Sequence, residues 1–216
     1  MHKQILNISP STKDDINGIL EIEKEHFANY VRVLDRKMII KWLEYNPDMF
    51  FVLKNECNTV VAFMILVPVS RKLYEKLQNG QVSDIYNFEK RQVEKKFRSD
   101  YFFVEEVCIS KKIQTASYIK TFRLLINCFF TALLHGRAKY VTTSPLTKEG
   151  VRLCGKLGFS FVSENEYLGE TYPIYELIIT SELYARFAKY NLACEGENIR
   201  ARDWHEAYCI VEGVDQ

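Results

Sequence analysis

The stretch from Tyr101 to Gly136 constrains the fold most, because it combines a buried strand with a helix that follows it almost directly. Tyr101–Ile109 is almost wholly apolar, and its two charged residues, Glu105 and Glu106, lie in the middle. The helix expected over residues 117–135 has apolar residues around much of its circumference, which is typical of broad burial. A strand that leads into a helix N-terminus presents backbone amides that can hold an anion. We therefore expect any chemistry of this chain to lie within this stretch, whose helix Gly136 is expected to cap.

The rest of the chain adds strands and helices on both sides of this unit. Strands are expected over residues 5–8, 49–54, 59–68, 139–143, 159–162 and 172–179, and helices over 16–27, 36–46, 147–157 and 182–190. Asp35 is expected to cap the second helix, and the first is apolar on one face apart from a glutamate, Glu23. This order predicts a mixed α/β sheet flanked by helices.

The domain organisation follows from the same pattern. We expect one domain over residues 1–180, with a charged helical insertion at 70–100. The charge run of the insertion is interpreted as a solvated face, with a lid over a substrate cleft as the alternative. Residues 181–216 are expected to form a C-terminal helix and a tail that pack on the domain or on a partner subunit.

Charge and cysteine usage narrow the classes of function. A formal net charge of +1 gives no reason to expect a nucleic acid or an anionic membrane as partner. No apolar run has the length of a membrane span, and the first residues do not resemble a signal sequence. The six cysteines lie far apart without a CxxC pair, which favours a reducing cytoplasm. The four histidines show no metal-binding spacing, so no metal is expected.

Residues 147–159, TKEGVRLCGKLGF, resemble the short helix of the GNAT superfamily of acyl-CoA-dependent N-acyltransferases, usually written NxxAxxLYxKxGF. Leu153, Lys156, Gly158 and Phe159 match that pattern, while Thr147, Gly150 and Cys154 replace its Asn, Ala and Tyr. The order of elements over roughly residues 3–180 is also similar to that family. The resemblance implies an α/β fold of the α+β type, with a mixed, mostly antiparallel central sheet flanked by helices.

The resemblance also implies acetyl-CoA as co-substrate. The family's pyrophosphate loop, Q/R-x-x-G-x-G/A, falls on Gln114, Thr115, Ala116, Ser117, Tyr118 and Ile119. It is degenerate here, because Ser117 and Ile119 stand at positions where small glycine-type residues are expected. The family's pantetheine arm inserts beside the central strand, which implies coenzyme contacts from the backbone of Val107, Cys108 and Ile109. Thr147 and Gly150 are the remaining expected coenzyme contacts. Four nearby basic residues can meet the phosphates or simply be solvated: Lys111, Lys112, Lys120 and Arg123.

Glu105, Glu106 and Cys154 are the candidate catalytic residues. Because side chains alternate along a strand, the two glutamates are expected on opposite faces, so that one reaches the amine, with Glu105 preferred. Burial would raise its pKa and suit it to accept a proton, unless it pairs with a basic residue or bonds within the sheet. In the family, a tyrosine at the position of Cys154 often protonates the departing thiolate. A thiol there donates through water or packs as a small helix residue.

Three functional hypotheses follow. The first is an N-acetyltransferase that moves an acetyl group from acetyl-CoA to a primary amine by direct attack in a ternary complex. Its acceptor, a small molecule or a peptide, is open among polyamine, amino acid, antibiotic and protein N-terminus. The second is a catalytically weakened protein of this fold that binds CoA or a regulatory partner. The third is an interaction module whose tail swaps onto a second copy in a homodimer.

Overall fold

The computed structural model describes residues 7–28, 34–82, 84–113, 115–167, 169–183 and 185, so the expectations for 1–6 and 186–216 lie outside it. Its strands are β1 (Asn7–Pro10), β2 (Phe50–Lys54), β3 (Val60–Val69), β4 (Tyr101–Ile109), β5 (Tyr140–Thr143), β6 (Ser160–Tyr167) and β7 (Glu170–Ile178). Its α-helices are α1 (Ile16–Phe27), α2 (Arg36–Tyr45), α3 (Arg71–Gln78), α4 (Thr115–His135) and α5 (Lys148–Leu157). Short 3-10 helices are η1 (Lys13–Asp15), η2 (Pro47–Met49), η3 (Ile85–Asn87) and η4 (Lys90–Gln92).

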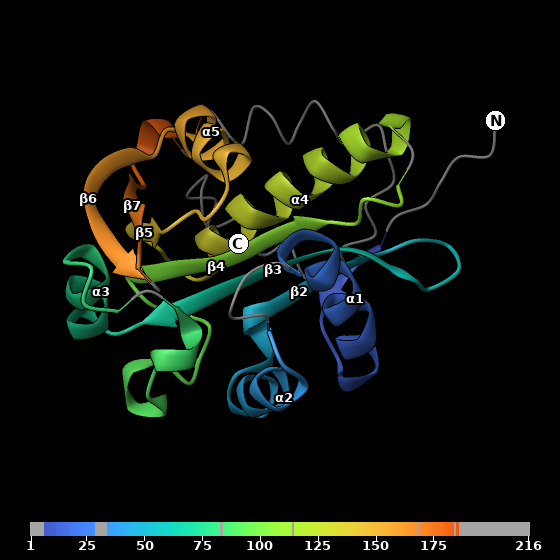
Figure 1. Ribbon diagram of the computed structural model, residues 1–216, viewed down its shortest axis with the longest axis horizontal. Coiled ribbons are helices and arrows are strands. Elements are labelled where there is room, and N and C mark those ends of the chain that lie inside the picture. The colour runs from blue at the N-terminus through green and yellow to red at the C-terminus, as the bar shows by residue number, and fades with distance from the viewer. Residues whose placement is uncertain are drawn as a thin grey trace, which may run out of the picture.

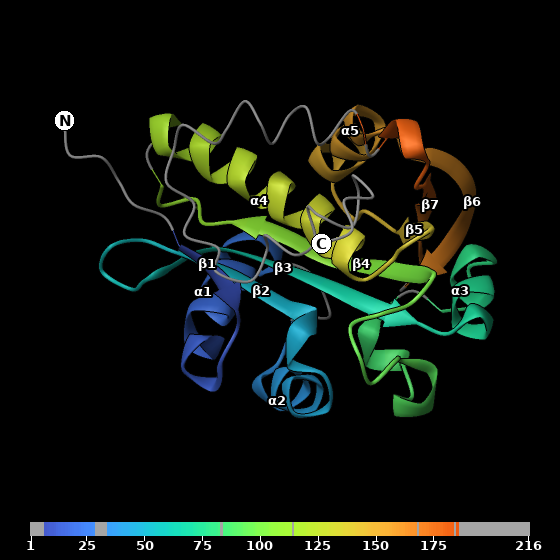
Figure 2. The same ribbon diagram turned by 180° about the vertical axis from the view of Figure 1, so that it is seen from behind.

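The strands form one sheet of seven in the order β1-β2-β3-β4-β5-β7-β6. The β4–β5 pair is parallel and the other pairs are antiparallel, which confirms the predicted mixed, mostly antiparallel sheet. Helices α1 and α2 cover one face of this sheet, and α4 and α5 cover the other (Figures 1 and 2). The parallel pair lies in the middle of the sheet, where α4 connects β4 to β5 across one face.

Each face of the sheet has its own hydrophobic core. The core under α1 and α2 includes the fully buried Trp42 and Phe63. The core under α4 and α5 includes Leu125, Phe130 and the fully buried Phe102. Alternate residues of β3 and β4 supply both cores, since successive strand side chains point to opposite faces. The central strands are therefore buried on both sides, as the apolar sequence of β4 predicts.

Local capping explains where the helices begin and end. The Asp35 carboxylate accepts a hydrogen bond from the Met38 N–H at 2.7 Å and starts α2, as expected. The Thr147 hydroxyl accepts from the Gly150 N–H at 3.0 Å and starts α5. Gly158, at φ +89°, ends α5 in the left-handed conformation that glycine adopts without steric cost. Helix α4 begins at Thr115, two residues earlier than predicted.

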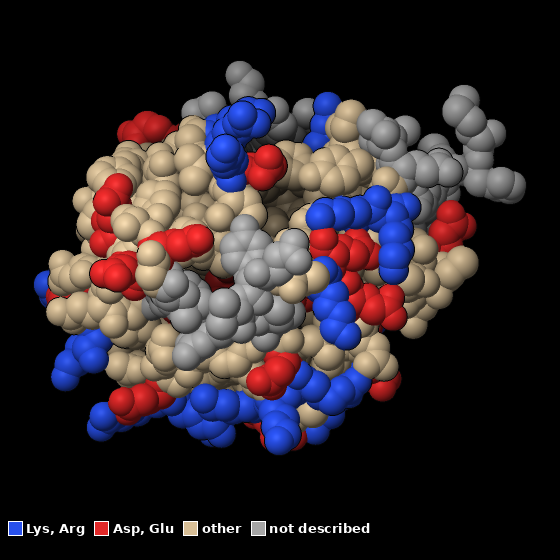
Figure 3. Space-filling view, viewed as in Figure 1, with Lys and Arg blue, Asp and Glu red and all other residues tan. Residues whose placement is uncertain are grey.

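The segment between β3 and β4 contains α3, η3 and η4. It is attached to the far edge of the sheet, because the Tyr74 hydroxyl bonds the Glu176 carboxylate of β7 and the Ser163 hydroxyl of β6 donates to the Gln78 carbonyl. Residues 89–91 and 94–96 of the charge run are exposed. Figure 3 shows Lys and Arg side chains gathered along the lower edge of the molecule, over α2 and this segment.

Candidate active site

Strands β4 and β5 part in the middle of the sheet. Their pairing ends at Val104 and Thr143, and the Thr143 hydroxyl donates to the Val104 carbonyl at 3.0 Å. Pro145 follows two residues later and has no N–H to continue a ladder. Among the described residues, no strand pairs with β4 on this side beyond Val104. The second half of β4 therefore presents an open backbone edge.

A β-bulge sits at this same point and decides where the two glutamates lie. Ile65 of β3 pairs with Glu106 and Leu66 pairs with Val104, so Glu105 is an extra residue in β4. Glu105 bonds to η3 and Glu106 contacts α1, so both carboxyl groups lie on the α1 face of the sheet. The expectation of opposite faces is wrong, because the bulge interrupts the alternation on which it rested.

The backbone edge of β4 can be assigned group by group. Ser110 donates its N–H to the Val61 carbonyl at 2.9 Å, and Ile109 pairs with Ala62. Bonded and non-bonded residue pairs alternate along an antiparallel ladder, so Cys108 bonds to β3 while Val107 and Ile109 direct their peptide groups to the open side. His26 of α1 contacts the Ile109 carbonyl through Nε2 at 2.8 Å. The Val107 N–H and carbonyl and the Ile109 N–H therefore face the opening.

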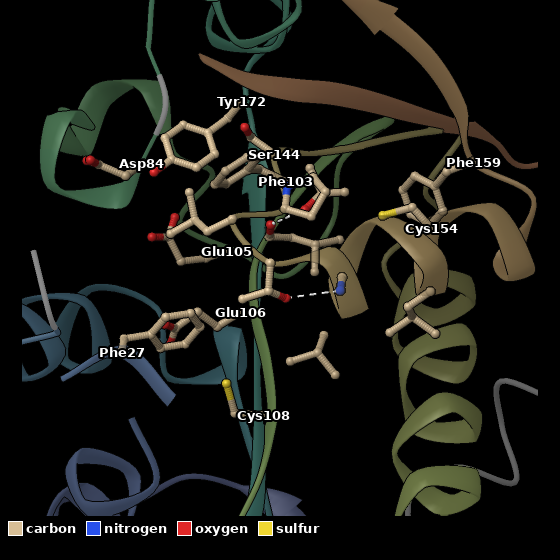
Figure 4. A pocket seen from close by; sticks show the side chains of 18 of the residues that line it. Phe27, Asp84, Phe103, Glu105, Glu106, Cys108, Ser144, Cys154, Phe159 and Tyr172 are labelled. Atoms are coloured by element: carbon tan, nitrogen blue, oxygen red, sulfur yellow. Dashed lines mark hydrogen bonds between the residues drawn. The ribbon is translucent and has the colours of Figure 1, made fainter. Parts of the chain in front are cut away.

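A cavity of about 580 Å³ occupies the gap between the strands. Its size is that of a small-molecule site. Glu105 and Glu106 lie on the side of α1 and η3, whereas Cys154 and Phe159 lie on the opposite side, at α5 (Figure 4). Asp84 also lines the cavity, but its carboxylate caps η3 by accepting from the Asn87 N–H at 3.2 Å. The cavity therefore joins the two faces of the sheet beside the open edge of β4.

The Glu105 carboxylate is held in the cavity wall by one backbone donor. Its Oε2 accepts a hydrogen bond from the Ile85 N–H at 2.9 Å. Burial, and then the nearby charges of Asp84 and Glu23, raise the pKa of Glu105 well above its usual value, against the opposing effect of the Ile85 bond. A carboxyl group with a raised pKa is a better proton acceptor than an ordinary glutamate once it is ionised.

Glu106 lies against Glu23 of α1. Burial raises the pKa of Glu106 well above its usual value, and the charges of Glu23 and Glu105 raise it further. Burial raises the pKa of Glu23 to about 7, although a hydrogen bond from the Leu34 N–H, 2.7 Å long, acts in the other direction. The two carboxyl groups are too close for both to ionise easily, so they share a proton or bind a positively charged donor.

Cys154 lies in the α5 wall of the cavity and is 7% exposed. Burial raises the pKa of its thiol to about 12, so the thiol stays protonated at neutral pH. Cys108 lines the cavity from the α1 face, and burial together with the charges of Glu106 and Glu23 raises its thiol pKa. Neither thiol is an activated nucleophile in these surroundings.

The structure describes only part of the expected pyrophosphate loop, residues 114–119. Gln114 lies outside the described residues, as do the side chains of Thr115 and Ala116. Ser117 is half-buried, and the side chains of Tyr118 and Ile119 are exposed. Thr147 and Gly150 line the cavity at the start of α5.

Two of the basic residues near this loop are held by α1. The Glu25 carboxylate accepts from the Lys111 N–H at 2.6 Å and lies 3.3 Å from Lys112 Nζ. Lys112 Nζ also lies 3.7 Å from Glu21. The Lys112 ammonium therefore has acidic partners within the chain, and the Lys111 ammonium donates to the Glu25 main-chain carbonyl, whereas Arg123 is exposed on α4.

Several polar residues of the cavity lining were not predicted as site residues, among them Glu23, Asp84 and Tyr172. Glu23 left a signal, because it is the single charged residue on an apolar helix face. The sequence gives no such signal for Asp84, a polar residue in a turn, or for Tyr172, a polar residue near the start of a strand.

The fold recurs in solved structures of acetyltransferases, although no protein-family model and no curated protein matches the sequence. The loading GNATL domain of CurA from Lyngbya majuscula has a TM-score of 0.60 at 10% identity, over 81% of this chain and 98% of that one. An N-acetyltransferase from Staphylococcus aureus Mu50 has a TM-score of 0.54 at 14% identity, over 82% and 99%. The yncA structure from Salmonella typhimurium, with its cofactor acetyl-CoA, has a TM-score of 0.54 at 15% identity, over 81% and 94%.

These likenesses define the class of fold. The mixed sheet, with parted central strands and helices on both faces, is the GNAT fold that the sequence resemblance predicted. None of the described helices is both long and apolar enough to cross a bilayer. Within the described part of the chain, no three His, Cys, Asp or Glu side chains converge in a geometry that would hold a metal ion.

Proposed function

We propose that this chain is an N-acetyltransferase that transfers an acetyl group from acetyl-CoA to a primary amine in a ternary complex. The observation that carries the proposal is the position of Glu105, a half-buried residue whose carboxyl group lies beside the open backbone edge of β4. The GNAT fold supports the same reaction, and the yncA structure has acetyl-CoA as its cofactor. A cytoplasmic location agrees with the buried thiols of Cys108, Cys128 and Cys154.

The residues present fit an acyl-CoA. The Val107 N–H and carbonyl and the Ile109 N–H can bond an extended amide-bearing arm as a neighbouring strand would. Cys108 is omitted from this set because its peptide groups bond to β3. The first backbone N–H groups of α4, from Thr115 onward, have no partner within the helix and suit a diphosphate. Ser117 adds a hydroxyl at that end of the helix.

The chain's own groups then divide the work of the transfer. Glu105 takes the proton that the amine nitrogen loses as its bond to the acyl carbon forms, directly or through water. The Val107 N–H faces the opening and can donate to the acyl oxygen, where negative charge develops. The bond from the acyl carbon to the coenzyme sulfur then breaks, and the thiolate takes up a proton.

Cys154 does not supply that last proton in our proposal. Its pKa of about 12 makes it a weaker acid than an ordinary thiol, whose pKa is about 8.5, so transfer from Cys154 to the departing thiolate would be uphill. We propose instead that Cys154 is part of the cavity wall that contacts the bound acyl-CoA. The proton taken by Glu105 is the more suitable source for the thiolate.

Calorimetry and turnover together test the proposal. Titration with acetyl-CoA and with CoA should show binding of both, and a panel of primary amines should release the coenzyme thiol in step with acetylation of the amine. Failure to bind either coenzyme would overturn the proposal. Binding of both coenzymes with no amine acetylated would instead support a GNAT-fold binding or regulatory protein. Ser117 and Ile119, in place of the small residues of a typical phosphate loop, are the observation that favours this second candidate.

A further inference from the structure

Among the described residues of the cavity wall, those that can be charged near neutral pH are all acidic, and they ionise most readily when a cation lies beside them. The described lining includes no Lys, Arg or His. It includes five acidic residues: Glu23, Asp84, Glu105, Glu106 and Glu170. Aromatic side chains lie among them, including Phe27 and Tyr172 (Figure 4). A cleft lined by one sign of charge and low-dielectric walls concentrates ligands of the opposite sign. The cavity is therefore suited to a cation with apolar parts.

One of these carboxyl groups is both buried and incompletely bonded. Glu23 is 1% exposed, and while its Oε1 accepts from the Leu34 N–H, its Oε2 has no hydrogen-bond partner in the described structure. Oε2 of Glu106 also lacks one, and the two carboxyl groups can bond each other only through a shared proton. A buried acceptor without a donor costs about 1–3 kcal/mol. An ammonium group, with its several N–H donors, would satisfy both oxygens at once.

From this arrangement we infer that the acceptor is a diamine, whose reacting nitrogen is a neutral primary amine and whose second nitrogen, at the other end of an aliphatic chain, is protonated. The second nitrogen binds between Glu23 and Glu106, and the reacting nitrogen lies at Glu105. The inference rests on the proposed function, since it names the substrate class of the same site. It concerns recognition, and adds no step to the transfer.

The shape of the acidic wall favours a diamine over other cations. The described carboxylates do not converge in threes on one point, as a compact metal ion would require. Two neighbouring acidic positions, Glu105 beside the Ile85 N–H of η3 and the contact between Glu23 and Glu106 under α1, match the two nitrogens of a diamine. Phe27 and Phe103 line the same cavity and offer apolar contact to a methylene chain.

The same wall discriminates against amino acids. A free amino acid would bring a carboxylate into a cavity whose described lining has no basic side chain to pair with it. Like charges brought together at close range cost several kcal/mol. The acidic wall thus rejects such molecules as well as attracting diamines, which is how a site becomes specific.

The test compares diamines with monoamines of equal chain length. The kcat/KM of the wild-type protein is measured with putrescine and cadaverine, and with n-butylamine and n-pentylamine. We expect the diamines to be favoured by at least about 30-fold, the least expected from one buried charge pair. Glu23→Gln keeps an acceptor for the Leu34 N–H and should bring this ratio close to one. Equal kcat/KM values for diamines and monoamines in the wild type would overturn the inference and leave the proposed function standing.

Two further variants make the result specific. Glu21→Gln lies on the same helix, has an exposed side chain, and should leave the ratio unchanged. Glu106→Gln removes the other carboxylate of the pair and should also lower the ratio. It keeps the test decisive if Glu23→Gln does not fold. If no amine is acetylated, the proposed function fails, and calorimetry then decides the inference separately. Tighter binding of putrescine than of n-butylamine would still support it, and equal binding would overturn it.

Discussion

Glu23 and Glu106 face each other inside the cavity, one from α1 and the other from the bulged half of β4. In each carboxyl group, the oxygen Oε2 is buried and has no hydrogen-bond partner in the described structure. Such a contact stores unfavourable electrostatic free energy unless a proton or a cation lies between the groups. The pair therefore links the stability of the protein to pH and, in our proposal, to the acceptor.

The first prediction concerns stability against pH. Burial raises the pKa of Glu23 from the usual 4.5 to about 7 in the folded chain, so the folded state holds this proton more tightly than the unfolded state. The stabilisation from this group is complete below about pH 4.5 and is lost as the pH rises through about 7. Glu23→Gln has no proton to lose there. Between these pH values, the free energy of unfolding of the wild type should fall by roughly 2–3 kcal/mol relative to the variant.

Urea denaturation at a series of pH values measures this difference. Glu105 also has a raised pKa, but it is present in the wild type and in the variant, so its effect largely cancels. Glu23 raises the pKa of Glu106, so the difference between the two proteins measures the pair of Glu23 and Glu106 together. Parallel pH profiles for the two proteins would show that Glu23 is not buried as a high-pKa carboxyl group.

The second prediction concerns two glycines, one with no room for a Cβ atom and the other with ample room. Gly136 was expected to cap α4, but the left-handed residue there is Arg137, at φ +59°. Gly136 instead allows close packing, since a Cβ on it would lie 2.4 Å from Cζ of the buried Phe102. Gly136→Ala should therefore lower the free energy of unfolding by about 1–3 kcal/mol. Gly155→Ala, in α5, should raise it by about 0.5–1 kcal/mol, because the new Cβ meets no atom within 4 Å other than those of its chain neighbours and its own helix backbone.

Chemical denaturation of both variants beside the wild type gives the two signs in one experiment. A neutral or stabilising Gly136→Ala would contradict the packing of α4 on Phe102. A destabilising Gly155→Ala would contradict the open, helical surroundings of Gly155.

The third prediction concerns the backbone edge of β4. The Val107 N–H faces the opening, so a proline at this position removes no bond between β3 and β4. Val107→Pro should keep the fold but lower kcat by about 10²–10³-fold, the usual effect of losing one oxyanion donor. Cys108→Pro is the matched control, because it removes a bond within the sheet and should cost about 3 kcal/mol of stability. Full activity of Val107→Pro would exclude this N–H from the reaction.

Much of the fold could be predicted from sequence because local patterns and the global structure agree. The apolar run 101–109 forms β4 within its predicted bounds, and Thr147 and Gly158 delimit α5 as their capping chemistry requires. The GNAT-like helix motif at 147–159 adds the fold class, which the solved structures confirm. The predicted bounds of α4 and of the edge strands differ by a few residues, since the ends of elements depend on tertiary contacts.

The arrangement of the site could be predicted only in part. Glu105 and Glu106 do line the cavity, but their common face depends on a register shift between Ile65 and Leu66 of another strand. Alternation within one strand contains no information about such a bulge. The contact between Glu106 and Glu23 likewise depends on how α1 lies across the sheet, although a glutamate on an apolar helix face is a usable signal.

The most direct test of the account is the turnover of Glu105→Gln beside that of the wild type, with putrescine as acceptor. Coenzyme affinity is measured on the same preparations by calorimetry with CoA. We predict that kcat falls by about 10²–10⁴-fold, as the loss of a general base requires, while the affinity for CoA does not change. Unchanged turnover in Glu105→Gln would contradict the central claim that the Glu105 carboxyl group takes the proton of the attacking amine.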